Sequence, residues 1–437
     1  MKYYFVGIKG TGMSALAQIL KKLGYEVEGS DKSDHFFTED ALIENGIKIY
    51  EFNKDNITED MIIVQGNAFK DTHEEIVRAN ELGLKIYSYQ DMVGKLTKMF
   101  KTITVSGCHG KTTTTAMLSH VLGSITGCNY LIGDGTGNAN KENEYFALEA
   151  CEYKRHFLAY TPHYAIITNI ELDHIDYYKD IDDVISAYQE YARLAEKMVI
   201  ACGDDPYTRL LEVNVPIFYY GLDESNDIVA KDVEFRDDGT SFDVFVEDNY
   251  YGHFDLPLFG KHMLLNALAV IGICYYERLE AKEVAKNLKT FKGAKRRFKE
   301  NVIGDIVTID DYAHHPTEVK VTIKGARQKY PDKQIVAILK THTLSRTKEM
   351  ADDFAKALNL ADKAYIMDVG VDREEEGYDD ATYEVILEKL DNGEYINIDM
   401  ADKLLQYENA VMIFMSSKDI YKLQTKYEEL LNEKLSK

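Results

Sequence analysis

The segment that most constrains the fold of this chain is a glycine-rich turn between an apolar run and a helix-like stretch. Residues 106–115 read Ser-Gly-Cys-His-Gly-Lys-Thr-Thr-Thr-Thr, after Thr102–Val105 and before Ala116–Leu122. Strand, glycine turn, lysine, hydroxyls and helix together present backbone N–H groups and a mobile positive charge to a polyphosphate. The segment therefore predicts an α/β sheet with a nucleotide-phosphate site at one strand end.

The match to the general phosphate loop is partial. The pattern G-x-x-x-x-G-K-[ST] requires glycine where Val105 stands, so the chain carries the shorter G-x-x-G-K-T from Gly107 to Thr112. An ordinary turn with a chance lysine is the alternative. We expect ATP or GTP binding, because strand, glycines, lysine and threonine occur in the order that the mechanism needs. The candidate residues are Gly107, Cys108, His109, Gly110, Lys111, Thr112 and Thr113, with Lys111 also assigned a catalytic role.

Composition narrows the class of protein. A length of 437 residues suggests about two to four domains, and a hydrophobic content of 45% is sufficient for packed cores. The formal charge of −23 argues against nucleic acid as a partner, because phosphate backbones are bound by basic surfaces. Five irregularly spaced cysteines without a C-x-x-C pair suggest reduced thiols and no zinc site.

Neither a leader nor a membrane span is expected. The chain enters a strand-like run at Tyr3 without a charged leader, and no apolar run approaches the roughly 18 residues of a membrane helix. We therefore expect a cytoplasmic protein without membrane insertion, as a monomer or weak dimer.

Strand-like runs alternate with helical periodicity along the chain, which predicts parallel, doubly wound sheets. In the first helical run, Met13, Leu16, Ala17, Leu20 and Leu23 fall at helical spacing. The expected strands are Tyr3–Gly7, Glu26–Gly29, Met61–Gly66, Thr102–Ser106, Tyr145–Glu149, Ala165–Asn169, Met198–Cys202, Val307–Asp311, Gln334–Leu339, Ala364–Asp368 and Val411–Met415.

We divide the chain into three domains, 1–98, 99–298 and 299–437. The middle one contains a different piece, Thr240–Phe254, in which apolar residues alternate before the turn Glu247-Asp248-Asn249. This alternation predicts an antiparallel β-hairpin inserted in the middle domain.

A second glycine turn, Gly-Ile-Lys-Gly-Thr-Gly-Met at 7–13, follows the first strand. The dinucleotide fingerprint requires glycine where Lys9 stands, so NAD is not expected. A glycine turn at a helix start suits a diphosphate, and Asp31, roughly 20 residues on, suits a ribose hydroxyl; a plain tight turn is the alternative. The candidate residues are Gly10, Thr11, Gly12, Met13, Ser30 and Asp31.

Two strand ends of the middle domain carry groups that suit a metal ion. Glu149 ends one strand and His174 follows another, and the ends of parallel strands are where ligands bind. A carboxylate and an imidazole beside a phosphate loop suit Mg²⁺, with Thr112 completing the shell, and tolerate Mn²⁺ equally well. Ordinary hydrogen bonding within loops is the alternative for each residue.

A basic cluster, Lys295–Phe298, lies at the second domain boundary, and Asp310–Pro316 ends the first strand of the third domain. A guanidinium matches phosphate in a bidentate manner, so the cluster suits an anionic ligand. A solvated run of charges is the alternative. His342 and Arg346 follow the next strand, where we expect them to face the same ligand.

These motifs, in this order, resemble those of the Mur ligase family, and the likeness extends over essentially the whole chain. Within the family it points to the branch that joins L-alanine to UDP-N-acetylmuramate. The matching segments are Gly-Ile-Lys-Gly-Thr-Gly-Met at 7–13, Gly-Cys-His-Gly-Lys-Thr at 107–112, Glu-Ala-Cys-Glu-Tyr at 149–153, Thr-Asn-Ile-Glu-Leu-Asp-His at 168–174, Gly-Lys-His-x-x-x-Asn at 260–266, Arg-Arg-Phe at 296–298 and Asp-Asp-Tyr-Ala-His-His-Pro at 310–316.

The resemblance implies an α/β fold of three domains. These are a Rossmann-like N-terminal domain for the UDP-sugar, a P-loop-type central ATPase domain with the β-hairpin insertion, and a Rossmann-like C-terminal domain for the amino acid. It implies ATP-dependent amide formation through an acyl phosphate in peptidoglycan precursor synthesis, with Mg²⁺ as cofactor and UDP-N-acetylmuramate and L-alanine as substrates. The third domain is expected to close over the second to keep water from the acyl phosphate.

The resemblance also implies roles for single residues. By motif match, Lys111 and Thr112 hold the phosphates and Mg²⁺, Glu149 and His174 are metal ligands, His262 and Asn266 lie on the adenine side, Arg297 and Asp311 contact the nucleotide, and His342 and Arg346 form the amino-acid end. The base that accepts the proton of the amine is His314 or His342.

The chain departs from the family pattern at several positions. Met263 stands where the family usually has Asn, Lys340-Thr341-His342 replaces Gln-Pro-His, and Ser416-Ser417-Lys418-Asp419 replaces Gly-Ala-Gly-Asp. The segment Asp372–Asp380 is unusually acidic. One interpretation is drift in solvated loops; the other is an altered acceptor, an amine with additional positive charge. The alternatives to L-alanine ligation are thus a paralogue with a different amine acceptor or a non-catalytic nucleotide-binding relative.

Overall fold

The structure is a computed structural model that describes residues 2–371, 377–378 and 380–436. These residues form three β-sheets flanked by helices, and the chain separates into two compact units. Unit 1 comprises Met1–Lys231, Asp243–Phe254 and Leu265–Phe291, and unit 2 comprises Asp232–Phe242, Asp255–Leu264 and Lys292–Lys437. In the described ranges, no helix combines the length and the apolar character that crossing a membrane requires.

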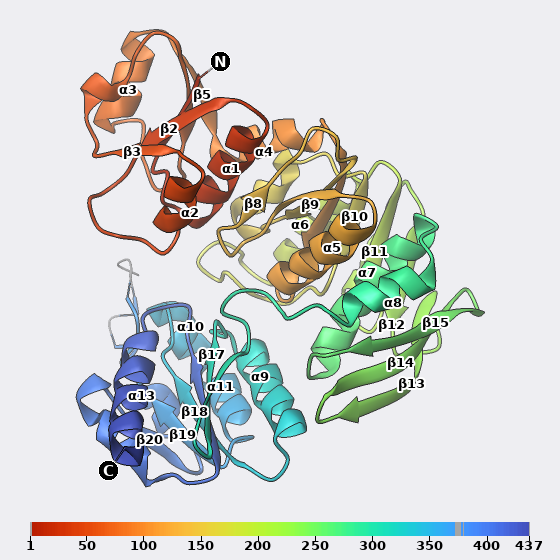
Figure 1. Cartoon of the computed structure of the whole chain (residues 1–437), viewed down its shortest axis with the longest axis vertical. Coiled ribbons are helices and arrows are strands. Elements are labelled where there is room, and N and C mark those ends of the chain that lie inside the picture. The colour runs from red at the N-terminus through yellow and green to blue at the C-terminus, as the bar shows by residue number, and fades with distance from the viewer. Residues whose placement is uncertain (1, 372–376, 379, 437) are drawn as a thin grey trace. The chain divides into compact units, whose positions relative to one another are not determined.

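The first sheet lies in unit 1 and has the strand order β3-β2-β1-β4-β5, with parallel pairs throughout (Figure 1). Its elements are β1 (Lys2–Val6), α1 (Thr11–Lys22), β2 (Glu26–Ser30), α2 (Glu39–Glu44), β3 (Lys48–Tyr50), η1 (Lys54–Asn56), β4 (Met61–Gln65), α3 (Glu74–Glu81), β5 (Lys85–Ser88) and α4 (Tyr89–Thr97). The helical spacing of Met13, Leu16, Ala17 and Leu20 is confirmed, because α1 buries all four. The strand order reverses between β1 and β4, and ligands bind at such reversals.

The second sheet has the order β15-β14-β13-β12-β11-β10-β6-β9-β7-β8. Its parallel core and the nearby helices are β6 (Lys101–Ser106), α5 (Lys111–Ile125), β7 (Cys128–Leu131), β8 (Gly137–Asn138), β9 (Tyr145–Glu149), η2 (Tyr153–Ala159), β10 (Tyr164–Ile167), α6 (Ile181–Ala192), β11 (Met198–Cys202), η3 (Thr208–Leu210), β12 (Ile217–Gly221), α7 (Lys261–Tyr276) and α8 (Ala281–Leu288). Strands β10, β6 and β9 are parallel neighbours, so their carboxyl ends meet at one edge. The phosphate loop follows the middle strand of these three.

The predicted β-hairpin is confirmed. Strands β14 (Gly239–Val246) and β15 (Asn249–Leu256) are neighbours joined by Glu247 and Asp248, whose φ values are 47° and 64°. Positive φ at both positions is typical of the two-residue turn that links antiparallel strands. A further strand, β13 (Ile228–Arg236), connects the hairpin to β12.

The third sheet lies in unit 2 and has the order β16-β17-β21-β18-β19-β20. Strands β16 and β17 pair in an antiparallel manner, and the neighbouring pairs among β17, β21, β18, β19 and β20 are parallel. The helix that follows β17 begins at Pro316, with His315 as its N-cap. The elements are β16 (Lys299–Ile303), β17 (Ile306–Asp311), α9 (Pro316–Lys329), β18 (Gln334–Leu339), α10 (Leu344–Glu349), α11 (Ala351–Leu358), β19 (Lys363–Ile366), α12 (Glu384–Leu387), β20 (Gly393–Tyr395), η4 (Ile398–Gln406), β21 (Ala410–Met415) and α13 (Tyr421–Leu435).

Candidate functional site

The loop that joins β6 to α5 depends on two glycines with positive φ. Gly107 has φ 140° and Gly110 has φ 86°, which side chains rarely adopt. A Cβ on Gly107 would lie 1.9 Å from Thr168 Oγ1, and one on Gly110 would lie 2.7 Å from Asn266 Oδ1. Both the backbone conformation and the close neighbours therefore require glycine at these positions.

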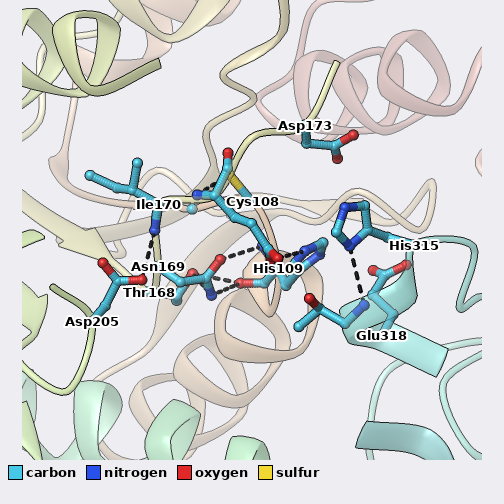
Figure 2. A network of polar contacts seen from close by, with 12 residues as sticks. Cys108, His109, Thr168, Asn169, Ile170, Asp173, Asp205, His315 and Glu318 are labelled. Atoms are coloured by element: carbon cyan, nitrogen blue, oxygen red, sulfur yellow. Dashed lines mark hydrogen bonds and ion pairs between the residues drawn. The ribbon is translucent and has the colours of Figure 1, made fainter. Parts of the chain in front are cut away.

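The segment after β10 holds the loop in place (Figure 2). Thr168 Oγ1 and Asn169 Nδ2 donate to the carbonyl of His109 at 2.5 and 2.9 Å, and Asn169 Oδ1 accepts from the His109 N–H at 2.9 Å. Cys108 Sγ accepts from the Glu171 N–H at 3.2 Å. Burial raises the pKa of the Cys108 thiol, so Cys108 serves here as a neutral packing group. These hydrogen bonds thus tie the loop to the segment after β10.

Lys111 and His174 converge on a single buried carboxylate. Lys111 Nζ donates to the carbonyls of Gly107 and Cys108 at 2.6 and 3.2 Å, and it lies 2.8 Å from Glu152 Oε2. Glu152 is 1% exposed, and its Oε1 lies 3.4 Å from His174 Nε2. Burial opposes ionisation of Glu152, but Lys111 and His174 hold its pKa below the ordinary value. Burial alone would lower the pKa of Lys111, but the charge of Glu152 raises it.

Thr112 and Glu149 form the part of the site that is rich in oxygen. Thr112 Oγ1 donates to Glu149 Oε1 at 3.1 Å, and the Gly133 N–H donates to Glu149 Oε2 at 2.7 Å. A hydroxyl beside a carboxylate is a donor set that Mg²⁺ prefers, so these two residues fit the ion. The structure brings Thr112 and Glu149 together, whereas His174, the third predicted ligand, lies against Glu152.

The predicted diphosphate residues Gly10–Met13 begin helix α1, with Gly10 as its N-cap. Lys9, which breaks the dinucleotide fingerprint, is 4% exposed; its Nζ donates to two carbonyls of the loop after β2 and pairs with Glu39 at 2.8 Å. Asp31 Oδ2 accepts from the Lys9 N–H at 2.7 Å. Lys9 and Asp31 therefore stabilise the two loops that flank the start of α1.

Ser30 has a partner inside the first sheet. Its hydroxyl donates to Glu75 Oε2 at 2.5 Å, and Glu75, which is fully buried, also accepts from the Tyr4 hydroxyl at 2.9 Å. The Ser30 hydroxyl thus ties β2 to α3.

Within unit 1, the start of α1 and Glu149 lie on two sides of one short loop, residues 133–136. The Gly133 N–H bonds Glu149, and a Cβ on Gly135 would lie 3.5 Å from Thr11 Cγ2. Tyr89 makes a second link: a Cβ on Gly12 would lie 2.7 Å from Tyr89 Oη, and burial, then Glu149, raises the Tyr89 pKa. Thr11, one of the diphosphate candidates, and the carboxylate of Glu149 thus both lie against residues 133–136.

Helix α7 carries both residues predicted for the adenine side. Asn266 is 5% exposed and lies against Gly110 in unit 1. In unit 2, burial and then the charge of Arg297 lower the pKa of His262 to about 4, so its ring is neutral at physiological pH. Met263, in the same helix, is buried.

Arg297 and Asp311 have protein partners in unit 2. Arg297 Nη1 lies 3.4 Å from Glu318 Oε1. Asp311 is 5% exposed and accepts from the N–H groups of Phe298 and Ala313, each at 2.8 Å. Burial raises the pKa of Asp311, and Arg297 opposes this. Asp311 therefore links the segment just before β16 to the turn just after β17.

The candidate bases lie close to each other. His314 follows β17 and His342 follows β18, and their ring centroids are 6.5 Å apart. His314 Nδ1 lies 3.1 Å from Glu318 Oε2. Arg346 belongs to α10 and is 7% exposed. The structure thus brings the two histidines together after strand ends of the third sheet.

Lys340, which departs from the family pattern, forms an ion pair. Lys340 Nζ lies 2.5 Å from Asp419 Oδ1, and Lys422 Nζ lies 2.9 Å from Asp419 Oδ2. Against partial burial, these two lysines lower the pKa of Asp419 to about 2. The carboxylate is therefore ionised throughout the physiological range.

Ser416, which stands where the family pattern has glycine, occupies space at the end of β21. Ser416 is fully buried; its hydroxyl donates to the Lys340 carbonyl at 2.8 Å and accepts from the Lys418 N–H at 3.0 Å. Thr341 is fully buried beside them, and Ser417 is half-buried. Residues 372–376 and 379 of the predicted acidic segment lie outside the described residues, and Asp380 pairs with Lys348 at 2.8 Å.

Sequence reasoning did not identify Glu152 or Tyr89. Glu152 lies in the motif from which Glu149 was chosen, so a second carboxylate three positions on was the available signal. No sequence signal placed Tyr89 beside Gly12, because that contact joins α4 to α1.

Comparison with protein families finds three matching models. The model described as "Mur ligase family, catalytic domain" matches residues 2–101, "Mur ligase middle domain" matches 105–274, and "Mur ligase, glutamate ligase domain" matches 296–418. Together these ranges take in most of the chain.

Solved structures give the same result. The chain is similar to the UDP-N-acetylmuramate-alanine ligase MurC from Thermotoga maritima, with 26% identity, a TM-score of 0.82 and coverage of 100% of both chains. It is also similar to the murein peptide ligase Mpl from Psychrobacter arcticus 273-4, with 25% identity, a TM-score of 0.70 and coverage of 99% of both. The MurF ligase from Thermotoga maritima, solved with ADP, is 18% identical at a TM-score of 0.66, with coverage of 93% of this chain and 95% of that one, a likeness of fold.

Proposed function

Because the chain belongs to the Mur ligase family, we propose that it joins the carboxylate of UDP-N-acetylmuramate to L-alanine while ATP is converted to ADP and phosphate. The observation that carries the proposal lies in unit 1. There Glu149 accepts hydrogen bonds from Thr112, at the end of the glycine loop, and from Gly133, and the loop of residues 133–136 lies against Thr11 at the start of α1. A phosphoryl donor and a sugar-linked acid bound at these two places are within one loop of each other.

The chemistry explains why both places are needed. A carboxylate is a poor acceptor for an amine, because the leaving group would be oxide. Transfer of the γ-phosphoryl group gives an acyl phosphate, whose leaving group is phosphate. This transfer requires stabilisation of negative charge more than a covalent protein intermediate, and Lys111 supplies a positive charge in the glycine loop.

The second step is attack by the amine on the acyl phosphate. The amine loses a proton as the amide forms, and His314 or His342 accepts it in this proposal. Support comes from their location after strand ends of the third sheet, with ring centroids 6.5 Å apart. Arg346, one turn into the helix after His342, is the candidate for the carboxylate of the amino acid.

Thr112 and Glu149 are the residues proposed to hold Mg²⁺, and the adjacent hydroxyl and carboxylate support this. When bound, the ion would neutralise charge on the phosphates. Other residues of the chain would bind the phosphates. Gly107 and Gly110 allow backbone N–H groups to face them, and Asn266 packs against the loop.

The test is phosphate release by purified protein from ATP and UDP-N-acetylmuramate, with single amino acids added in turn. We expect release only when ATP, the UDP-sugar and L-alanine are all present. Binding of ATP without release for any amine would identify a non-catalytic relative and contradict the proposal.

A second candidate is a ligase for a different amine. The ion pair of Lys340 with Asp419 and the filled turn at Ser416 favour it, because both lie at strand ends of the sheet assigned to the amino acid. In the same assay this candidate predicts release with another amino acid or peptide and little with L-alanine.

A further inference from the structure

Glu152 connects groups that come from three strand ends. It follows β9, Lys111 belongs to the loop after β6, and His174 lies in the segment after β10. These strands are parallel neighbours, with β6 between the other two. At 1% exposure, the carboxylate of Glu152 lies 2.8 Å from Lys111 Nζ and 3.4 Å from His174 Nε2. Glu152 therefore links a lysine and a histidine that come from different loops.

The backbone of Glu152 is itself held. Its carbonyl accepts from the Tyr178 hydroxyl at 2.5 Å and from the Arg155 N–H at 2.8 Å. Because both contacts fix the main chain, the carboxylate has little freedom to follow Lys111 if the ammonium moves. The ammonium of Lys111 can then contact either Glu152 or another anion, but not both.

The donors of Lys111 are fully used in this arrangement. An ammonium has three N–H donors, and Lys111 contacts the Gly107 and Cys108 carbonyls as well as Glu152. A phosphate that takes Lys111 therefore displaces one of these partners. The carbonyls belong to the loop that wraps the phosphate, so Glu152 is the partner that is displaced.

We propose that Glu152 is a positioning residue that competes with nucleotide phosphate for Lys111 while it keeps His174 in place. The inference rests on the proposed nucleotide site. It predicts effects of opposite sign: the carboxylate lowers nucleotide affinity, because it must give up Lys111, and it raises turnover, because it aligns Lys111 and His174. If the carboxylate had a merely structural role, it would support both nucleotide affinity and turnover, so its loss would lower both.

Glu152→Gln tests this through ADP binding measured by calorimetry in the presence of a metal chelator. The amide leaves the buried Lys111 without a compensating charge, and the phosphate of ADP then supplies it. We expect ADP affinity to rise about tenfold, within the range of coupling measured for close charge pairs, and kcat to fall at least about tenfold. Equal or weaker ADP binding by the variant would overturn the proposal.

Two further variants separate the explanations. Glu144→Gln is the matched control, since Glu144 pairs with Lys101 at 2.7 Å beside the opposite ends of β9 and β6; we expect affinity and turnover to remain unchanged. Glu152→Asp keeps the charge but is too short to reach both partners, so we expect kcat to fall with ADP affinity within about threefold of the parent. Unchanged turnover in Glu152→Asp would overturn the proposal even if Glu152→Gln failed to fold. A parent protein that does not bind ADP would refute the proposed function itself.

Discussion

Single residues of the candidate site are held by partners of opposite charge within the protein. Lys111 forms an ion pair with Glu152, Arg297 with Glu318, and Lys340 with Asp419. The chain carries a formal charge of −23, so local pairing decides which cations remain available to an anionic ligand. The protein thus holds a few basic side chains at defined positions and does not rely on a broadly basic surface.

Lys111→Ala removes the one mobile cation of the phosphate loop. We expect phosphate release to fall by at least about a thousandfold, because the loss concerns charge that develops in the transition state. The fold should survive, since Glu152 keeps His174 as a partner. Thermal unfolding checks the fold, and the control is Lys101→Ala, at the start of the strand that leads into the loop. Near-normal turnover in Lys111→Ala would refute the assignment.

His262 gives unit 2 a dependence on pH. The folded protein holds its pKa at about 4, whereas the unfolded chain has the ordinary value of about 6.5. The unfolded state therefore binds the proton first, so this contribution to stability is complete above about pH 6.5 and is lost as the pH falls toward 4. We expect the parent to lose roughly 2 kcal/mol more than His262→Gln over this range in denaturant unfolding. Parallel pH profiles for the two proteins would contradict the expectation.

At the scale of elements, the site is built from loops at the carboxyl ends of parallel strands. Such loops carry side chains that do not pack in the core, and their backbones need turns that only certain residues allow. The loop after β6 needs Gly107 at φ 140°, and the segment after β10 then closes over it through Thr168. In the proposed function, loop shape determines where phosphate binds more than helix or strand identity does.

Gly107→Ala should disrupt the loop without altering the core of β6. The added Cβ would lie 1.9 Å from Thr168 Oγ1 at a φ that alanine rarely adopts, so we expect a loss of roughly 2–4 kcal/mol and of ADP binding. Gly123→Ala in α5 is the matched control, because its Cβ meets open space; it should stabilise the helix by up to about 1 kcal/mol. Equal ADP affinity in both variants, measured by calorimetry, would contradict this account of the loop.

The central strands of each sheet were predictable because they are apolar and buried on both faces. Strands β6, β11 and β18 match the sequence-based prediction to within about one residue. The missed strands are short or half-exposed: β3 spans Lys48–Tyr50 and β20 spans Gly393–Tyr395, where three residues give no clear periodicity. Edge strands such as β16 depend on pairing with a neighbour, which a single sequence does not report.

At the scale of the whole molecule, the sequence predicted the alternation of strands and helices and the order of the motifs. It did not predict which side chains meet, because these contacts join residues far apart in the chain. Tyr89 beside Gly12 and Glu152 beside Lys111 are examples. The proximity of Thr11 and Glu149 through residues 133–136 likewise depends on the packing of β7 and β8 against α1. Function follows from these long-range contacts more than from any single motif.

The account depends on direct transfer of the γ-phosphoryl group of ATP, bound at the loop Gly107–Thr112, to an acid carried by a sugar nucleotide. The most direct measurement uses UDP-N-acetylmuramate whose carboxylate is labelled with heavy oxygen, with mass spectrometry of the phosphate released during ligation. The account predicts one heavy oxygen atom in the phosphate and none in ADP, because the amine displaces phosphate from the acyl carbon and the bridging oxygen, which came from the acid, leaves with the phosphate. Amide formation with unlabelled phosphate would contradict it.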